Sequence, residues 1–467
     1  MKKHIFIFST LVLCWCNIVF AQSEEDDLSN FDSSKIESAK DFFTKSKWHF
    51  HSRTYFMSTI NEGSLKDDYT LAQGAGLGLL TRPISGFQIG VSGYFIFNLV
   101  SSDLSKADPI TNGNNRYEIG QYDITRPLNK SDLDRLEDLF LRYSFNKSNI
   151  TLGRFELQTP FVNMQDGRMR PTIEEGVWLS IKEFKKIGFN GGFIWAISPR
   201  STVEWFKGGN SVGLYGQGVN VDGTKSNYKN NIQSRGLAIG NVVIKPFKKL
   251  EINIWDGYFE NVMNTVFVEV KNEIKKSKII FYQAIMFINQ QSIRDGGNSN
   301  QQKTYINQGA ISNSFSSQLG FKYSNINLNL NYTHVTNDGR YLMPREWGRD
   351  PFYTFMPRER NEGSGGVNAF TINLNYSFKN NKFKAGLGYG FFKLPLISDF
   401  RLNKYSMPSY HQINLSSTYT FNKFWKGIDV RMLIASKIQE GQEKLNPIYV
   451  YNKVNLVNFS LIVDIKL

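Results

Sequence analysis

Two stretches of this chain alternate apolar and polar residues with a period of two. In INLNLNYTHV (Ile326–Val335) and FTINLNYSF (370–378), large apolar side chains share one face, and asparagine, threonine and serine share the other. This period predicts β-strands and not helices. A face rich in asparagine suits contact with water better than a packed core.

Applied from Trp48 onward, the same pattern predicts about eighteen strands, whose connections alternate between short and long. The short ones are expected at 81–86, 146–148, 246–249, 324–325 and 379–382. The long ones are expected near 100–135, 157–174, 199–230, 291–312, 337–366, 392–408 and 438–453, and two more links, near 60–69 and 259–263, complete nine on the same side. We therefore expect an all-β fold, a transmembrane antiparallel barrel with short periplasmic turns and long extracellular loops.

A secreted β-sandwich or β-propeller also contains alternating strands, but neither requires long and short links to alternate. The final segment FSLIVDIKL (459–467) places apolar residues outward, as the closing strand of a barrel does. Aromatic residues gather near the inferred strand ends and predict girdles at the two membrane interfaces. They include Phe87, Tyr94, Phe95, Phe97, Tyr376, Phe378, Tyr419 and Phe421.

The first residues predict export. A basic start with Lys2 and Lys3, an apolar run and a small residue at Ala21 form a secretory signal. We expect a signal peptide at 1–21, a periplasmic lead at 22–47 and the barrel at 48–467. Beyond the signal we find no run of eighteen apolar residues, which excludes a bundle of transmembrane helices.

Charge and cysteine content limit the classes of function that are possible for the chain. Both cysteines, Cys14 and Cys16, lie in the signal, so the mature chain has neither disulfides nor thiolate metal sites. The whole chain has 55 basic and 41 acidic residues, and loss of Lys2 and Lys3 leaves a mature charge of +12. Export excludes nucleic acid as a partner, so the excess of positive charge indicates small anions.

At this point four features resemble OprD-type outer-membrane porins. Three are stretches of sequence: HSRTYFM (51–57) followed by 69–95, the segment 136–179, and PREWGRDPFYTFMPRERNEG (344–363). The fourth is the strand order, so the resemblance spans nearly the whole mature chain. It implies a channel of ~18 strands, narrowed by a loop folded into the lumen, that admits small solutes, often carboxylates, by passive diffusion.

On that resemblance, TPFVNMQDGRMRP (159–171) corresponds to an inward third loop, and 344–363 to a second constriction element. A loop inside a pore must anchor its own backbone, so we expect the four acids of 344–363 to pair with neighbouring arginines while Trp347, Phe352, Tyr353 and Phe355 wedge it against the wall. The predicted constriction residues are Asp166, Arg168, Arg170, Arg345, Arg349, Tyr353, Arg358 and Arg360.

Strand parity predicts a ladder of basic side chains along the pore wall, consisting of Arg53, Arg142, Lys182, Lys322, Lys384, Arg431 and Lys437. The alternation would place Arg154 and Arg235 on the same face as neighbouring apolar residues. We therefore expect each to lie at a bulge or at the rim of the barrel, and whether they face inward or outward stays open. Acids at Asp166, Glu174, Glu175, Asp429 and Asp464 offer contacts for an amine, which leaves zwitterionic solutes open beside carboxylates.

We predict a substrate-selective porin, not an enzyme, with no cofactor and no metal. The mature histidines are His49, His51, His334 and His411, none in a catalytic motif, and the pair His49 and His51 lacks a nearby third ligand. A plug with a 22-stranded siderophore barrel exceeds the available length. A surface adhesin and a porin for neutral oligosaccharides remain alternatives.

Expected partners are the small-molecule solute, outer-membrane lipid and lipopolysaccharide, and the barrel assembly machinery. Nucleic acid is not expected as a partner. The sequence leaves both a monomer and a homotrimer open.

Overall fold

The computed structural model describes residues 44–165, 167–378 and 382–467. The predicted signal peptide, most of the predicted periplasmic lead and Asp166 lie outside these residues. The strands are β1 (Lys47–Asn61), β2 (Asp68–Leu80), β3 (Phe87–Ser101), β4 (Arg135–Phe145), β5 (Ser148–Phe155), β6 (Ile173–Ile181), β7 (Ile187–Ser198), β8 (Phe206–Lys207), β9 (Leu237–Phe247), β10 (Leu250–Phe259), β11 (Met263–Lys276), β12 (Ile279–Ser292), β13 (Ile311–Tyr323), β14 (Ile326–Val335), β15 (Val367–Ser377), β16 (Phe383–Lys393), β17 (Tyr410–Thr420), β18 (Ile428–Gln439) and β19 (Leu456–Lys466).

Helical structure in the described residues includes short 3₁₀ turns, and no helix there is long and apolar enough to cross a membrane. The 3₁₀ turns are η2 (Ile119–Gln121), η3 (Gly208–Ser211), η4 (Gln301–Lys303), η5 (Arg345–Trp347), η7 (Lys423–Trp425) and η8 (Pro447–Tyr449).

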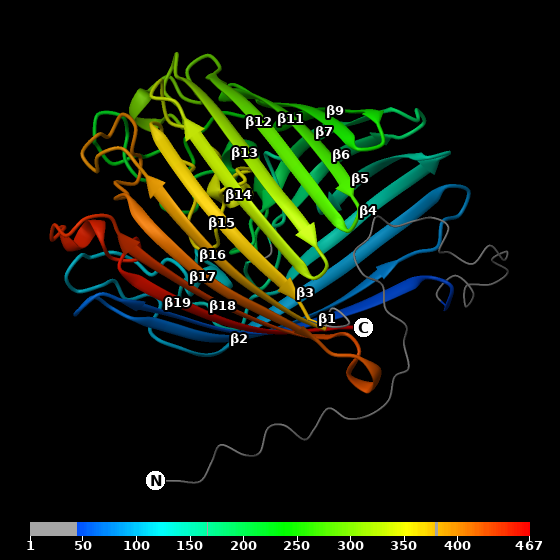
Figure 1. The fold of residues 1–467 in the computed structure, drawn as a ribbon, viewed down its shortest axis with the longest axis horizontal. Helices are drawn as coiled ribbons and strands as arrows, with labels where there is room; N and C mark the ends of the chain where they lie inside the picture. Colours follow the sequence, from blue (N-terminus) through cyan, green and yellow to red (C-terminus); the bar gives the residue numbers. More distant parts are fainter. Residues whose placement is uncertain (1–43, 166, 379–381) are drawn as a thin grey trace, which may run out of the picture.

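The sheet closes on itself, because β1 pairs antiparallel with both β2 and β19 (Figure 1). Each strand pairs with its neighbours along the chain, except that β7 pairs with β9 across the two-residue β8, which adds to β7 alone. Closure gives every strand except the two-residue β8 two partners, so no membrane-spanning strand exposes the N–H and C=O groups of an edge to lipid. The predicted antiparallel barrel of about eighteen strands is confirmed.

The predicted faces are also confirmed. Leu330 and Phe370 on the apolar face of β14 and β15 are exposed on the outside of the barrel, where lipid covers them. On the opposite face, Asn331 donates to Asn329 (2.8 Å) and to Thr371 (2.9 Å), and Asn373 donates to Asn329 (3.0 Å). The asparagines thus satisfy one another along the inner wall.

The connections at the two ends of the barrel differ in length, with L1 and L5 as exceptions. Eight short links join the strands at one end of the barrel, at 81–86, 146–147, 182–186, 248–249, 277–278, 324–325, 378–382 and 421–427. The links at the other end are L1 (62–67), L2 (102–134), L3 (156–172), L4 (199–236), L5 (260–262), L6 (293–310), L7 (336–366), L8 (394–409) and L9 (440–455). All of them except L1 and L5 are longer than any of the eight short links. Short links face the periplasm in outer-membrane barrels.

Outward aromatic side chains gather at the short-link ends of the strands. Phe87 and Tyr143 are exposed there with ring centroids 4.7 Å apart, and Tyr376 and Phe378 are exposed with centroids 4.6 Å apart. Tyr94 is a correction to the predicted girdle. Its side chain is buried inside the barrel, because Gly74 and Gly76 of β2 leave room that a Cβ would fill, at 2.6 and 2.5 Å from the ring.

The long links are packed structures with an apolar core of their own. Tyr305 of L6, Leu342 and Trp347 of L7, Met407 of L8 and Val454 of L9 belong to one buried cluster that continues onto the inner wall. Burial of this kind makes the loops part of the folded barrel and gives them defined positions within it.

Candidate functional site

A cavity of about 1380 Å³ lies inside the barrel between the loops and the wall. L2, L3, L4, L7, L8 and L9 line one part of it, and β17, β18 and β19 line another. Among the described residues, its charged lining consists of eight arginines, four lysines and two glutamates. They are Arg116, Arg168, Arg200, Arg345, Arg349, Arg358, Arg360, Arg431, Lys225, Lys229, Lys404, Lys453, Glu359 and Glu362.

L3 and L7, the two predicted constriction loops, are joined to each other. Asn163 of L3 accepts a hydrogen bond from the Arg349 N–H (3.0 Å) and donates one to the Arg349 carbonyl (2.9 Å). The Asn163 N–H donates to the carbonyl of Trp347 (2.9 Å), and the Thr172 hydroxyl donates to that of Glu346 (3.2 Å). L3 therefore supplies the hydrogen bonds that L7, which has no sheet neighbour here, cannot make for itself.

Only half of the acids in 344–363 pair with arginine. Glu362 accepts from Arg345 (2.6 Å), as expected. Glu346 accepts instead from the backbone N–H groups of Gly213 (3.0 Å) and Tyr215 (2.8 Å), and Asp350 accepts from the N–H of Asn361 (2.8 Å). The physical reason is that these tight loops leave backbone donors unpaired, and a buried carboxylate satisfies two at once.

Of the four aromatic residues predicted to wedge L7 against the wall, three contact other parts of the protein and one faces the cavity. Trp347 and Phe352 are buried, and Trp347 packs at 4.8 Å against Phe259 of the wall and donates to the Ser211 hydroxyl (2.9 Å). Tyr353 donates its hydroxyl to Glu269 of β11. Phe355 remains half-buried and lines the cavity.

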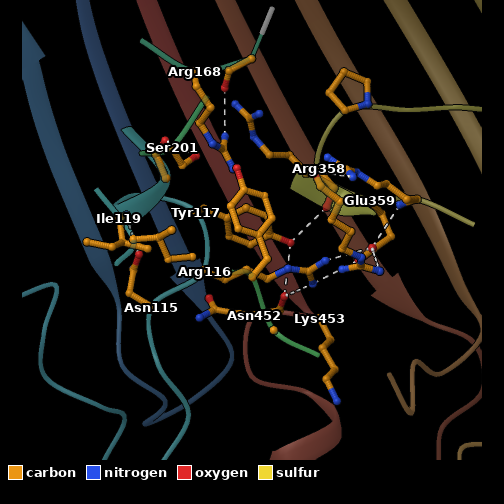
Figure 2. Close-up of a pocket in the computed structure, with 18 of the residues that line it drawn as sticks. Asn115, Arg116, Tyr117, Ile119, Arg168, Ser201, Arg358, Glu359, Asn452 and Lys453 are labelled. Atoms are coloured by element: carbon orange, nitrogen blue, oxygen red, sulfur yellow. Dashed lines mark hydrogen bonds and ion pairs between the residues drawn. The ribbon is translucent and has the colours of Figure 1, made fainter. Parts of the chain in front are cut away.

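Glu359 is the centre of a buried ionic cluster at the base of L7 (Figure 2). It accepts from Arg116 of L2 through both guanidinium nitrogens (3.0 and 3.2 Å) and from Lys437 of β18 (3.0 Å). Burial alone would raise the pKa of Glu359, but the charges of Arg116, Lys437 and Arg345 outweigh it and hold the pKa well below its ordinary value. The carboxylate therefore stays ionised and its charge is cancelled locally.

Arg358 projects from L7 onto the inner wall. Its guanidinium donates to Asn458 (2.6 Å) and Ser460 (2.6 Å) of β19 and to the Tyr55 hydroxyl of β1 (3.0 Å). The backbone of Arg358 has φ of 83°, a left-handed conformation that a non-glycine residue rarely adopts. All three acceptors are neutral, so the positive charge of Arg358 is not cancelled by them.

Arg168 and Arg360 also bond to neutral groups. Arg168 donates to the Gly167 carbonyl (2.9 Å), and its buried Nε atom has no partner among the described residues. Arg360 donates to the Arg345 carbonyl (3.2 Å) and to Gln165 (2.8 Å). Burial lowers the pKa of both groups, and the neighbouring charges of Arg358 and Arg345 lower it further. Such a lowering marks a place where an anion is favoured.

Arg349 differs from its neighbours because its side chain is exposed to the cavity. Within the part of the chain that the structure describes, its guanidinium makes no hydrogen bond or ion pair and lies 5.0 Å from the ring centroid of Phe355. It also lines a second cavity of about 490 Å³, which shares Gln158, Arg349 and Phe355 with the first. Arg349 thus borders both cavities.

Two members of the predicted basic ladder share one carboxylate. Arg53 of β1 is buried and donates to Asp464 of β19 (2.6 Å), which also bonds to His51 (3.0 Å) and to Arg431. Arg53 further donates to the carbonyl of Arg168 (2.6 Å), so it supports L3 from the wall. Of the seven predicted wall residues, Arg431 lines the main cavity.

The other wall residues lie elsewhere. Lys437 is fully buried beneath Glu359. Arg142, Lys182, Lys322 and Lys384 lie at or next to the short-link ends of β4, β6, β13 and β16. The structure therefore does not bring the seven residues together into one row.

Three further predicted positions lie away from the cavity lining. Arg170 is buried against the Leu133 carbonyl, and burial lowers its pKa to about 9. Arg154 has the parity of lipid-facing Leu152 and pairs with Glu175 (2.8 Å). Arg235 is exposed just before β9 and pairs with Glu260.

Sequence reasoning missed several lining residues outside the recognised loops, among them Arg116, Arg200 and Lys404. Each lies in a long link with no distinctive motif around it. The one local signal is a basic residue directly before a tyrosine, as in Arg116–Tyr117 and Lys404–Tyr405. Lys404 is buried with its ammonium 4.6 Å from the centroids of both Tyr228 and Tyr305.

The described residues contain no group of three or more histidine, cysteine, aspartate or glutamate side chains that could hold a metal ion. A closed barrel whose lumen is narrowed by arginine-bearing loops is the architecture of an outer-membrane channel. The model of the OprD family of outer membrane porins matches residues 40–360. The chain belongs to this family, and its location is the bacterial outer membrane.

Several crystal structures share the fold. Acinetobacter baumannii OccAB3 has a TM-score of 0.71 at 13% identity. Pseudomonas aeruginosa OccK9 (OpdG) has 0.70 at 12%, and Pseudomonas aeruginosa OpdK with vanillate has 0.68 at 12%. Each alignment covers 91% of this chain and 99% of the other. A comparison with curated proteins found no match.

Proposed function

We propose that this porin is a passive channel selective for small solutes that carry a carboxylate. The observation that carries the proposal is the charge of the main cavity, where twelve cationic side chains face two glutamates among the described residues. Both glutamates are already ion-paired inside the protein, Glu359 with Arg116 and Lys437 and Glu362 with Arg345. The remaining guanidinium edges supply the recognition.

The arginines suit transient binding of a carboxylate. Each guanidinium offers a planar set of donors, so a carboxylate can pass from one to the next while it sheds only part of its water. A contact at ~4 Å and an effective dielectric of ~20 amounts to ~4 kcal/mol before desolvation. Net binding near millimolar affinity, about −4 kcal/mol, lets the solute enter and also leave.

Neutral sugars fit this cavity less well. Sugars bind on open aromatic faces, but here guanidinium groups lie over the rings. Arg345 is 3.7 Å from the centroid of Tyr405, Arg349 is 5.0 Å from Phe355 and Arg116 is 5.3 Å from Tyr117. The aromatic rings therefore contact guanidinium groups of the protein, and the guanidinium groups, not the rings, are available to the solute.

To bind the amine of a zwitterionic solute, the channel would need a carboxylate that is not already paired with a cation of the protein. Among the described acids predicted for this role, Glu175 pairs with Arg154, and Asp464 bonds to Arg53, Arg431 and His51. The other two, Glu174 and Asp429, line neither cavity. In the second cavity, Glu251 pairs with Lys245 and Glu269 with Lys271. Simple carboxylates are therefore favoured over amino acids. Vanillate, present in the structure of OpdK, is itself a carboxylate.

The test is the reversal potential and conductance of the purified porin in planar bilayers under a salt gradient. The double variant Arg349→Gln/Arg358→Gln should shift the reversal potential towards cations and weaken block by added carboxylates. The control Arg235→Gln/Arg294→Gln removes the same charge from loop residues outside the cavity lining and should change neither. Equal shifts in both double variants, or block by a sugar in place of a carboxylate, would overturn the proposal.

A further inference from the structure

The two ends of the barrel differ sharply in charge. In the described part of the eight short links, ten lysines and Arg82 face one acid, Glu183. In the described part of L1 to L9, 23 basic residues face 21 acidic ones. The lysines of the short links are Lys147, Lys182, Lys185, Lys186, Lys248, Lys249, Lys278, Lys382, Lys423 and Lys426. We call this set the lysine rim.

Half of the lysine rim makes no ion pair within the described part of the protein. Lys185, Lys186, Lys248, Lys249 and Lys423 are exposed and make no ion pair with any residue that the structure describes. Lysine keeps a flexible stem and a compact charged head, which suits contact with many mobile anions more than one fixed partner.

Exposed aromatic residues fix the height of the lysine rim in the membrane. Phe184, Phe424 and Trp425 lie in the short links themselves, with 61%, 79% and 50% of their surface exposed. Aromatic side chains of this kind settle at the membrane–water interface. Lys185 and Lys423 are sequence neighbours of these rings, so their ammonium groups lie at the level of lipid headgroups.

We propose that the lysine rim binds anionic phospholipids of the periplasmic leaflet, with the ammonium groups against the headgroup phosphates. The charge complementarity is direct, because juxtamembrane clusters of lysine attract anionic lipids, and the attraction falls off within a Debye length. The barrel would thereby collect negatively charged lipid around its periplasmic end and be stabilised by it.

The first test is thermal stability in lipid nanodiscs of phosphatidylcholine alone and of phosphatidylcholine with one quarter phosphatidylglycerol. The unmodified porin should have a higher Tm in the anionic discs, and the gain should shrink by at least half in 0.5 M salt. The variant Lys185→Gln/Lys186→Gln/Lys248→Gln/Lys249→Gln should lose most of the gain. A control variant with Lys106, Lys130, Lys303 and Lys444 of the long links changed to glutamine should keep it.

The second test locates the lipid. Trp425 fluorescence, taken as the difference from a Trp425→Phe variant, should be quenched more by brominated phosphatidylglycerol than by brominated phosphatidylcholine at equal mole fraction. Equal quenching by the two lipids would overturn the proposal. So would a quadruple variant that alters anion selectivity but keeps its lipid-dependent Tm gain, because the lysines would then belong to the exit of the channel.

Discussion

Asn163 and Arg349 are 186 residues apart in the chain and exchange two hydrogen bonds, through the Asn163 side chain and the Arg349 backbone. The relationship joins L3 to L7 at Arg349, whose exposed side chain lines both cavities. The Asn163 side chain therefore supplies two of the hydrogen bonds that hold L7 in place beside the two cavities.

Asn163→Ala should open this junction. Both backbone groups of Arg349 lose their partner, at a cost of about 1–3 kcal/mol each if they stay dry, so L7 is expected to shift and admit water. Single-channel conductance should rise and anion preference should fall. Asn307→Ala in L6, outside the lining of either cavity, is the control, and an unchanged conductance in Asn163→Ala would show that the junction does not limit flow.

Gly348→Ala offers a second approach to the same junction without removing a polar group. Gly348 has φ of 144°, and a Cβ there would lie 2.3 Å from the Asn163 Oδ1 atom. We expect the same rise in conductance as in Asn163→Ala. Gly240→Ala of β9, which lines neither cavity and where a Cβ meets nothing within 4 Å, should behave as the unmodified porin. Crystal structures of the two variants would show whether L7 has moved.

Glu359→Gln should destabilise the barrel. It leaves Lys437, which is fully buried, without its carboxylate, and breaking a buried pair typically costs about 3–5 kcal/mol. The measurement is the temperature at which the folded band disappears from a heat-modifiability gel. Adding Lys437→Met to Glu359→Gln removes the stranded charge and should recover part of the loss, whereas a further loss would contradict this account.

Anion preference should weaken as the pH rises from 6 to 9. Lys453 of L9 and Lys404 of L8 both line the cavity, and burial lowers the pKa of Lys453 to about 8 and that of Lys404 to about 7. Both ammonium groups lose their protons within this range, so two positive charges leave the cavity while most arginines stay charged. Reversal potentials at pH 6 to 9 would reveal the change, Lys453→Gln should remove the part near pH 8, and Lys453→Gln/Lys404→Gln should abolish it.

Much of the fold could be predicted from local pattern. The period of two in β14 and β15 determines which face meets lipid, and the alternation of short and long links determines that neighbouring strands pair in order around a closed barrel. Both depend on contacts between strands adjacent in sequence, such as the register of Ile326 with Tyr376. Individual faces can still depart from the pattern, as at Tyr94, where glycines on the neighbouring strand create room inside.

The sequence by itself therefore determined the barrel, its two ends, and the loops that carry the arginines. Only the tertiary structure decided what each charge does. Glu359 meets Arg116 across 243 residues and Lys437 across 78, and no local pattern specifies these pairs. The physical reason is that a strand is satisfied by its neighbours in the ladder, whereas a loop inside a pore is satisfied by whichever distant groups the closed barrel brings to it.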